Sequence, residues 1–177
     1  MSKHTVVAFG IAGLVALIGI PAQAQTSFTR GQPAAGAATP EQIEQKAVAL
    51  YAHPERAEEA GQLQRQAAKL RAPDDPKGVT SLVMAARLFS YAHCLPAARQ
   101  TMEAAAERAL AMGDVVKAAQ AYVDAAFIAQ EQGSGTQVNR LAKKAVLLTA
   151  SPLLRADERA GIINRIHSSA QLAAAVK

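Results

Sequence analysis

The sequence has a single cysteine, no tryptophan and no long apolar run beyond its N-terminal segment. One cysteine excludes an intramolecular disulfide, so packing must hold the domain together. Cys94 stands between the apolar residues Tyr91 and Leu95, which favours a small buried side chain. An intermolecular disulfide through Cys94 stays open. Because no second long apolar run follows, we expect no transmembrane segment in the mature form.

The residues that catalysis needs are also scarce. After the N-terminal segment only His53, His93 and His167 remain, and no two of them are three to five residues apart. A helical face therefore presents no histidine pair for a metal. The sequence has no nucleophile elbow, no phosphate-binding glycine loop and no dinucleotide fingerprint. We expect a protein that is not an enzyme, with no catalytic residues, no metal and no cofactor.

Residues 1–24 resemble a cleavable signal peptide. Lys3 supplies the positive charge, and no formally charged residue occurs between Thr5 and Ile20. Ala22 and Ala24 give the small-x-small pattern that signal peptidase recognises, so Gln25 becomes the new N-terminus. The expected location is the periplasm or the exterior of the cell.

Helical periodicity dominates the rest of the chain, and no run of alternating β-branched residues predicts a sheet. Residues 25–39 are rich in small and turn-forming residues and are interpreted as a flexible linker. Residues 40–177 form the predicted all-α domain of about seven helices. Their expected ranges are 40–52, 54–71, 77–93, 95–112, 114–131, 136–150 and 155–175.

Several helix ends carry specific signals. Thr39 precedes Pro40 and lies three residues before Gln42, which predicts a capping box at the first helix. Asp75 is a candidate cap of the third helix. Gly113 is a C-terminal stop, followed by Asp114 as an N-cap.

Residues 99–126 resemble the tetratricopeptide repeat. Gly113 stands at the turn, Ala118 follows after five residues, Tyr122 after four more and Ala125 after another three, as in the second helix of that motif. The resemblance implies antiparallel helical hairpins stacked as a short right-handed array. In that array these four residues would pack neighbouring helices together. The alternative is a compact alanine-rich helical bundle.

The resemblance also implies a binding groove on the first helix of each hairpin, which would hold a protein or peptide. The side chains that would face this groove are Gln100, Glu103, Glu107, Asn139, Arg140 and Lys143. The other interpretation is the solvated side of amphipathic helices. The expected function is a non-enzymatic adaptor or scaffold in the periplasm or cell envelope.

The charge distribution along the chain supports an alternative function. Residues 135–177 hold seven basic residues against two acidic ones, so this third could bind an anionic envelope surface electrostatically. Nucleic acid is not an expected partner, because no aromatic residue follows Phe127 to stack on bases. Alanine-lined faces at the ends of a short stack are compatible with a homodimer.

Overall fold

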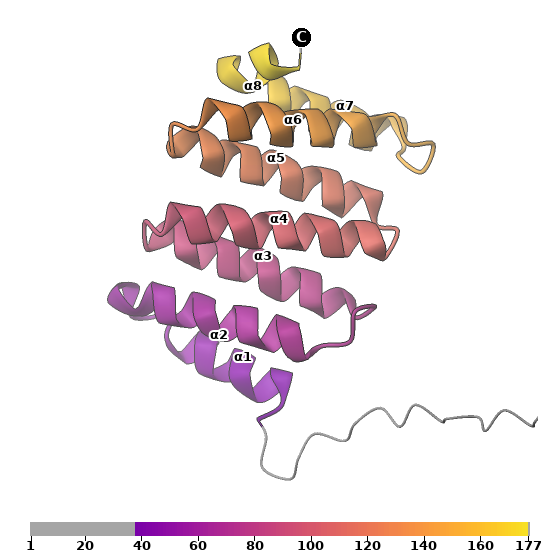
Figure 1. Cartoon of the computed structure of the whole chain (residues 1–177). Coiled ribbons are helices and arrows are strands. Elements are labelled where there is room, and N and C mark those ends of the chain that lie inside the picture. The colour runs from indigo at the N-terminus through magenta and orange to yellow at the C-terminus, as the bar shows by residue number, and fades with distance from the viewer. Residues whose placement is uncertain (1–37, 177) are drawn as a thin grey trace, which may run out of the picture. The chain divides into compact units, whose positions relative to one another are not determined.

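The computed structural model describes residues 38–176, and these residues form an all-α fold, as the sequence predicts, without a strand among them (Figure 1). The predicted cleavage residues Ala22, Ala24 and Gln25 lie outside the described residues. Within 38–176, no helix is both long enough and apolar enough to cross a bilayer. The elements are α1 (Pro40–Ala49), the 3₁₀ turn η1 (Pro54–Arg56), α2 (Ala57–Leu70), α3 (Pro76–Tyr91), α4 (Leu95–Ala111), α5 (Val115–Glu131), α6 (Gly135–Thr149), α7 (Ala156–His167) and α8 (Ala170–Ala175).

The predicted helix caps form. The Thr39 hydroxyl accepts a hydrogen bond from the backbone of Gln42, whose side chain accepts one from the backbone of Thr39, so the capping box is confirmed. Asp75 caps α3 through the backbone N–H of Lys77, and Asp114 caps α5. Each of these ends is therefore set by residues within three positions of the helix start.

From α1 to α6, each helix packs mainly against the helices before and after it in the chain. Figure 1 shows the result as a stack of antiparallel helices in two layers, with α2, α4 and α6 nearer the viewer and α3 and α5 behind them. The helix pairs are joined by short turns, which forces neighbours to run antiparallel.

Three successive turns share one geometry at a spacing of 20 residues. His93, Gly113 and Gly133 each adopt a positive φ, of 56°, 78° and 70°. After each of them the next backbone N–H bonds to a carbonyl five residues earlier, as in a Schellman motif. The three N···O pairs are Cys94–Phe89 at 2.8 Å, Asp114–Ala109 at 2.9 Å and Ser134–Ala129 at 3.0 Å. A helix and its turn thus occupy 20 residues between these points.

The same period recurs in the core. A fully buried alanine, with 0% exposure, occupies one position in each of four successive helices, at Ala85, Ala105, Ala125 and Ala145. Small side chains at these positions let the helices approach closely. Two such helices span about 40 residues, which is longer than the roughly 34 residues of a tetratricopeptide repeat.

Most predicted helix ends lie within two residues of those in the structure, and three features differ more. The first helix ends at Ala49 instead of at 52, and the second begins with a 3₁₀ turn before α2. The predicted last helix, 155–175, is two helices, so the described residues hold eight α-helices instead of about seven. The break occurs because Ser169 takes an extended conformation and caps α8, with its hydroxyl accepting from the backbone of Leu172. α8 then turns back and buries Leu172 against the core.

Cys94 differs from expectation as well. It immediately precedes the first residue of α4 and is only half-buried, because the turn at His93 lies at the surface. Phe89, one turn earlier on α3, takes the fully buried position instead.

Candidate functional site

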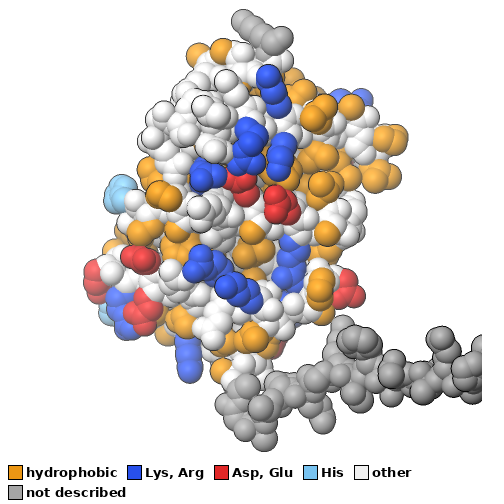
Figure 2. Space-filling model, in the orientation of Figure 1, with side chains coloured by type: hydrophobic (Ala, Val, Ile, Leu, Met, Phe, Trp, Pro, Cys, Tyr) orange, Lys and Arg blue, Asp and Glu red, His pale blue; other side chains and the backbone are white. Residues whose placement is uncertain are grey.

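The candidate site is the face formed by α2, α4 and α6, called the front face below. It is the side turned to the viewer in Figures 1 and 2. Figure 2 shows basic side chains over α6 and over α2, with acidic side chains between them. Charge on this face is therefore arranged in bands that follow the helices.

Of the predicted groove residues on α4 and α6, Glu103 and Arg140 contact each other. Nη2 of Arg140 lies 2.5 Å from Oε2 of Glu103, and Arg99 on α4 pairs with the other oxygen of the same carboxylate. The Glu103 side chain is only 13% exposed. Because both oxygens are engaged, Glu103 links α4 to α6 and is not free to receive a partner's donor group.

A second contact also joins these helices. Nζ of Lys144 lies 3.8 Å from the carboxylate of Glu107 and 4.9 Å from the ring centroid of Tyr122. Tyr122 is buried beneath it, on α5. The lysine thus joins α6 to both neighbouring helices, which fixes the orientation of this part of the face.

The other groove residues stay available at the surface. They are exposed side chains on α4 and α6, namely Gln100, Glu107, Asn139 and Lys143. The α4/α6 surface is defined here as these four residues together with the Glu103–Arg140 pair. Its polar groups project from two helices that the ion pairs hold in register.

The predicted packing residues occupy the interior or the turn that the sequence indicated. Ala118, Tyr122 and Ala125 are buried between helices. Gly113 provides the left-handed turn between α4 and α5 with φ of 78°.

Most of the basic residues in the last third are engaged within the protein. Arg159 donates to the Thr149 carbonyl at the C-terminal end of α6, with an N···O distance of 2.7 Å. Arg155 pairs with Asp157 and Glu158, and Arg165 pairs with Asp124 of α5. With Arg140 and Lys144 also paired, Lys143 is the basic residue in 135–176 that has no hydrogen-bonded or ionic side-chain contact among the described residues.

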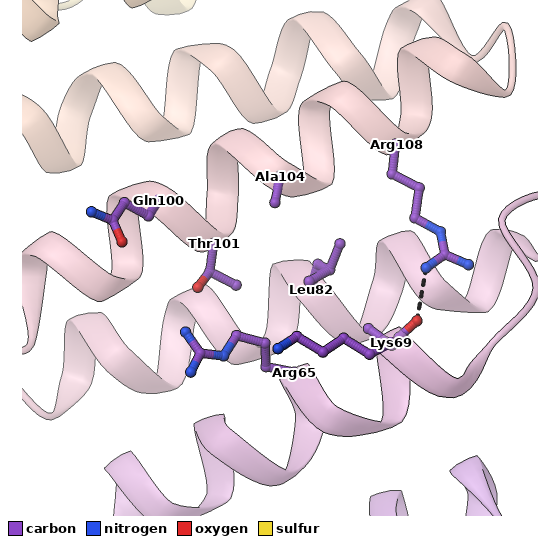
Figure 3. A pocket seen from close by; sticks show the side chains of 8 residues that line it. Arg65, Lys69, Leu82, Gln100, Thr101, Ala104 and Arg108 are labelled. Carbon is purple, nitrogen blue, oxygen red and sulfur yellow. Dashed lines mark hydrogen bonds between the residues drawn. The ribbon is translucent and has the colours of Figure 1, made fainter.

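A pocket of about 330 Å³ opens on the front face between α2 and α4. Its floor is Leu82 of α3, seen behind the two front helices in Figure 3. This α2/α4 pocket is lined by Arg65, Ala68, Lys69, Leu82, Gln100, Thr101, Ala104 and Arg108. The hollow on this face thus lies beside the predicted groove and shares only Gln100 with it.

Arg108 is the most constrained of the lining residues. Its guanidinium crosses from α4 to the C-terminal end of α2, where it donates to the carbonyls of Ala68, at 2.8 Å, and of Ala72 (Figure 3). A cation at a helix C-terminus satisfies carbonyls that have no partner within the helix. Its Nε is buried without a hydrogen-bond partner.

Of the residues that line this pocket, only Gln100 was predicted from the sequence as a site residue. Arg65 and Lys69 are four residues apart on α2, so their shared helical face is readable from sequence. Thr101 gives no such signal, because its burial depends on the approach of a separate helix.

Among residues 38–176, no group of three or more histidine, cysteine, aspartate or glutamate side chains is placed to hold a metal ion. Comparison with protein-family models, curated proteins and solved structures found no match to this chain. The site must therefore be interpreted from its own geometry.

Proposed function

We propose that this protein is an exported, non-enzymatic adaptor that binds a protein or peptide partner through the α4/α6 surface. The observation that carries the proposal is the pair of interhelical contacts, Arg140 with Glu103 and Lys144 with Glu107. These contacts hold exposed side chains of both charges in place on two neighbouring front helices. A preorganised surface loses less entropy on binding than a flexible one.

The tetratricopeptide-like array is part of the same proposal. It is supported by the stacked antiparallel helices and by the buried positions of Ala118, Tyr122 and Ala125. In such an array, successive front helices present one continuous surface to a partner.

The electrostatic alternative has less support. A binder of anionic envelope surfaces needs basic side chains that are free to reach headgroups. In the last third, Arg155, Arg159 and Arg165 instead contact acceptors within the protein. Carboxylates therefore offset the charges of Arg155 and Arg165 before any partner arrives, and the Arg159 guanidinium is already held at a backbone carbonyl.

The test is crosslinked capture from the native cell envelope, with the exported chain as bait and mass spectrometry as readout. The bait is compared with a double charge reversal on the α4/α6 surface, Glu107→Lys with Lys143→Glu. The matched control is Lys46→Glu, because Lys46 is exposed on α1. The proposal expects a small set of proteins that resists moderate salt, is kept by the control and is lost by the double variant.

Two results would contradict the proposal. Capture that moderate salt abolishes and that is rich in lipid or polysaccharide would favour the electrostatic alternative. A protein set retained equally by all three baits would place the contact on another face of the domain.

A further inference from the structure

The α2/α4 pocket carries positive charge that no carboxylate balances. Arg65, Lys69 and Arg108 line it, and none of the three forms an ion pair with an acidic side chain of residues 38–176. Arg65 donates to Gln62 and lies over the Phe89 ring, and Arg108 binds backbone carbonyls. Between α4 and α6, by contrast, Arg140 and Lys144 pair with the carboxylates of Glu103 and Glu107. The unbalanced charge predicts an anionic occupant for the pocket.

The pocket also contains a buried hydroxyl without a partner. Thr101 is 3% exposed, and its Oγ1 makes no hydrogen bond. Figure 3 shows its side chain pointing from α4 toward the α2 wall, above Arg65. A buried hydroxyl without a hydrogen-bond partner is unfavourable, so a ligand atom that accepts a hydrogen bond from it removes that cost. This is a second observation, independent of the charges, that indicates a ligand.

Apart from Gln100, the remaining lining residues are apolar. Leu82 and Ala68 are buried, and Ala104 adds a small side chain from α4. With the Arg65 and Lys69 heads on the α2 side, the pocket offers a cationic wall and an apolar floor. Its volume of about 330 Å³ lies at the lower end of the range for small-ligand sites.

We propose that the α2/α4 pocket binds a small organic carboxylate carrying a short apolar chain, of the size of hexanoate. The carboxylate accepts hydrogen bonds from Arg65 and from the Thr101 hydroxyl, and Lys69 adds charge at the mouth. The apolar chain lies on Leu82 and Ala104. A glutamate side chain of a docked protein stays attached to that protein's backbone outside the pocket. A free acid has no such attachment, so it can enter end-on and reach Thr101.

The first measurement titrates sodium hexanoate into the ¹⁵N-labelled chain, expressed at full length and purified in its processed form, and follows backbone amide shifts by NMR. The amides of Thr101 and Leu82 should move in a saturable manner. Hexanamide, which has the same shape without the charge, should bind about tenfold or more weakly, since one charged contact contributes about 1.4 kcal/mol or more. Inorganic phosphate should also bind more weakly, because it leaves the apolar floor uncovered.

Two variants test the residues. Thr101→Val keeps the shape and removes the hydroxyl, so hexanoate should bind about fivefold or more weakly while the melting temperature stays equal or rises. If the Thr101 hydroxyl only stabilised the fold, Thr101→Val would instead lower the melting temperature. Lys69→Gln should also weaken binding, whereas Lys46→Gln on α1, outside both the pocket and the α4/α6 surface, should leave it unchanged.

Equal affinity for hexanoate and hexanamide would overturn the proposal. So would the absence of amide shifts up to about 50 mM hexanoate, because a dissociation constant above that concentration is weaker than that of almost any specific site. Binding of a blocked alanyl-glutamyl-alanine peptide without binding of hexanoate would also overturn it, and would assign the pocket to a partner surface. These outcomes are independent of the adaptor function, because the capture experiment varies Glu107, Lys143 and Lys46, none of which lines the pocket.

Discussion

Arg108 on α4 fills the space above Gly78 on α3: a Cβ built on that glycine would lie 2.2 Å from the Arg108 guanidinium carbon. The missing side chain at Gly78 lets the guanidinium reach the carbonyls of Ala68 and Ala72 at the end of α2. Three successive helices therefore meet at one arginine. Arg108 lies at one end of the α2/α4 pocket, with Gln100 at the other (Figure 3).

The first prediction concerns Gly78→Ala. The added methyl group must displace the Arg108 guanidinium from its carbonyl acceptors. We expect the free energy of unfolding to fall by about 1–3 kcal/mol, the range for losing hydrogen bonds to a charged group. Urea denaturation followed by circular dichroism measures the change.

The control for this prediction is the same substitution in an Arg108→Ala background. There the methyl group meets no guanidinium, and alanine is the better helix former by roughly 0.5–1 kcal/mol. Gly78→Ala should then be neutral or stabilising. An equal loss in both backgrounds would show that the two residues are not coupled.

The second prediction concerns Arg71, at the C-terminal end of α2, whose side chain is 4% exposed. It pairs with Glu44 of α1 at 2.8 Å and with Asp75 at 3.0 Å, and these bonds raise the pKa of its guanidinium. Arg71→Met should lower the free energy of unfolding by about 2–4 kcal/mol, because it removes the buried cation that pairs with the carboxylates of Glu44 and Asp75. Thermal and urea denaturation measure the loss.

The matched control is Arg56→Met. Arg56 also pairs with a glutamate, Glu59, but both side chains are about half exposed, at 47% and 52%. Water screens such a pair, so we expect a change of about 0.5 kcal/mol or less. If the two substitutions cost the same, burial of Arg71 does not determine its contribution.

The third prediction concerns the stability of the fold at low pH. Hydrogen bonds from the Lys77 backbone and from the Arg71 guanidinium hold the pKa of Asp75 below its ordinary value. A carboxyl whose pKa is lower in the folded state stabilises the fold above the unfolded pKa, and this stability disappears as the pH falls through the folded pKa. The urea midpoint should therefore decrease as the pH falls below about 4.

Asp75→Asn isolates this effect. Asparagine caps a helix about as well as aspartate but does not titrate in this range. The variant should show a weaker dependence of the urea midpoint on pH between about 5 and 3, the range in which carboxylates titrate. A slope identical to that of the parent protein would assign the acid sensitivity to other carboxylates, such as Glu41, whose pKa is also lowered.

The fourth prediction concerns the turns that recur every 20 residues. Gly113 has φ of 78° and His93 has φ of 56°, which only glycine adopts without strain. Gly113→Ala should lower the free energy of unfolding by about 1 kcal/mol, and His93→Gly should raise it by up to about 1 kcal/mol. A Cβ at Gly113 meets no atom within 4 Å, so backbone strain alone accounts for the first change. Loss of stability in His93→Gly would indicate that the imidazole makes a compensating contact.

Local features were predictable from the sequence because they depend on residues close together in the chain. The capping box at Thr39, the N-caps at Asp75 and Asp114 and the stop at Gly113 all involve partners within a few positions. The recurrence of turns was readable only in part, because His93 occupies a position that glycine holds at the other two turns. The break at Ser168–Ser169 was not predicted, because helical periodicity continues across it.

The candidate site was predictable to a smaller extent. The sequence placed Glu103 and Arg140 on one face, but it gave no indication that they would pair with each other across 37 positions. That pairing requires α4 and α6 to lie side by side, a consequence of how three helices stack.

The sequence by itself determined that this chain is helical and where most of its helices begin and end, because capping and turn formation are local. The tertiary structure alone decided which polar groups are buried. Arg71, Thr101 and Arg108 look like ordinary surface residues in the sequence, and each acquires its environment from a helix tens of positions away. Burial is a property of packed surfaces, so these residues and the pocket that two of them line emerge only when the helices are stacked.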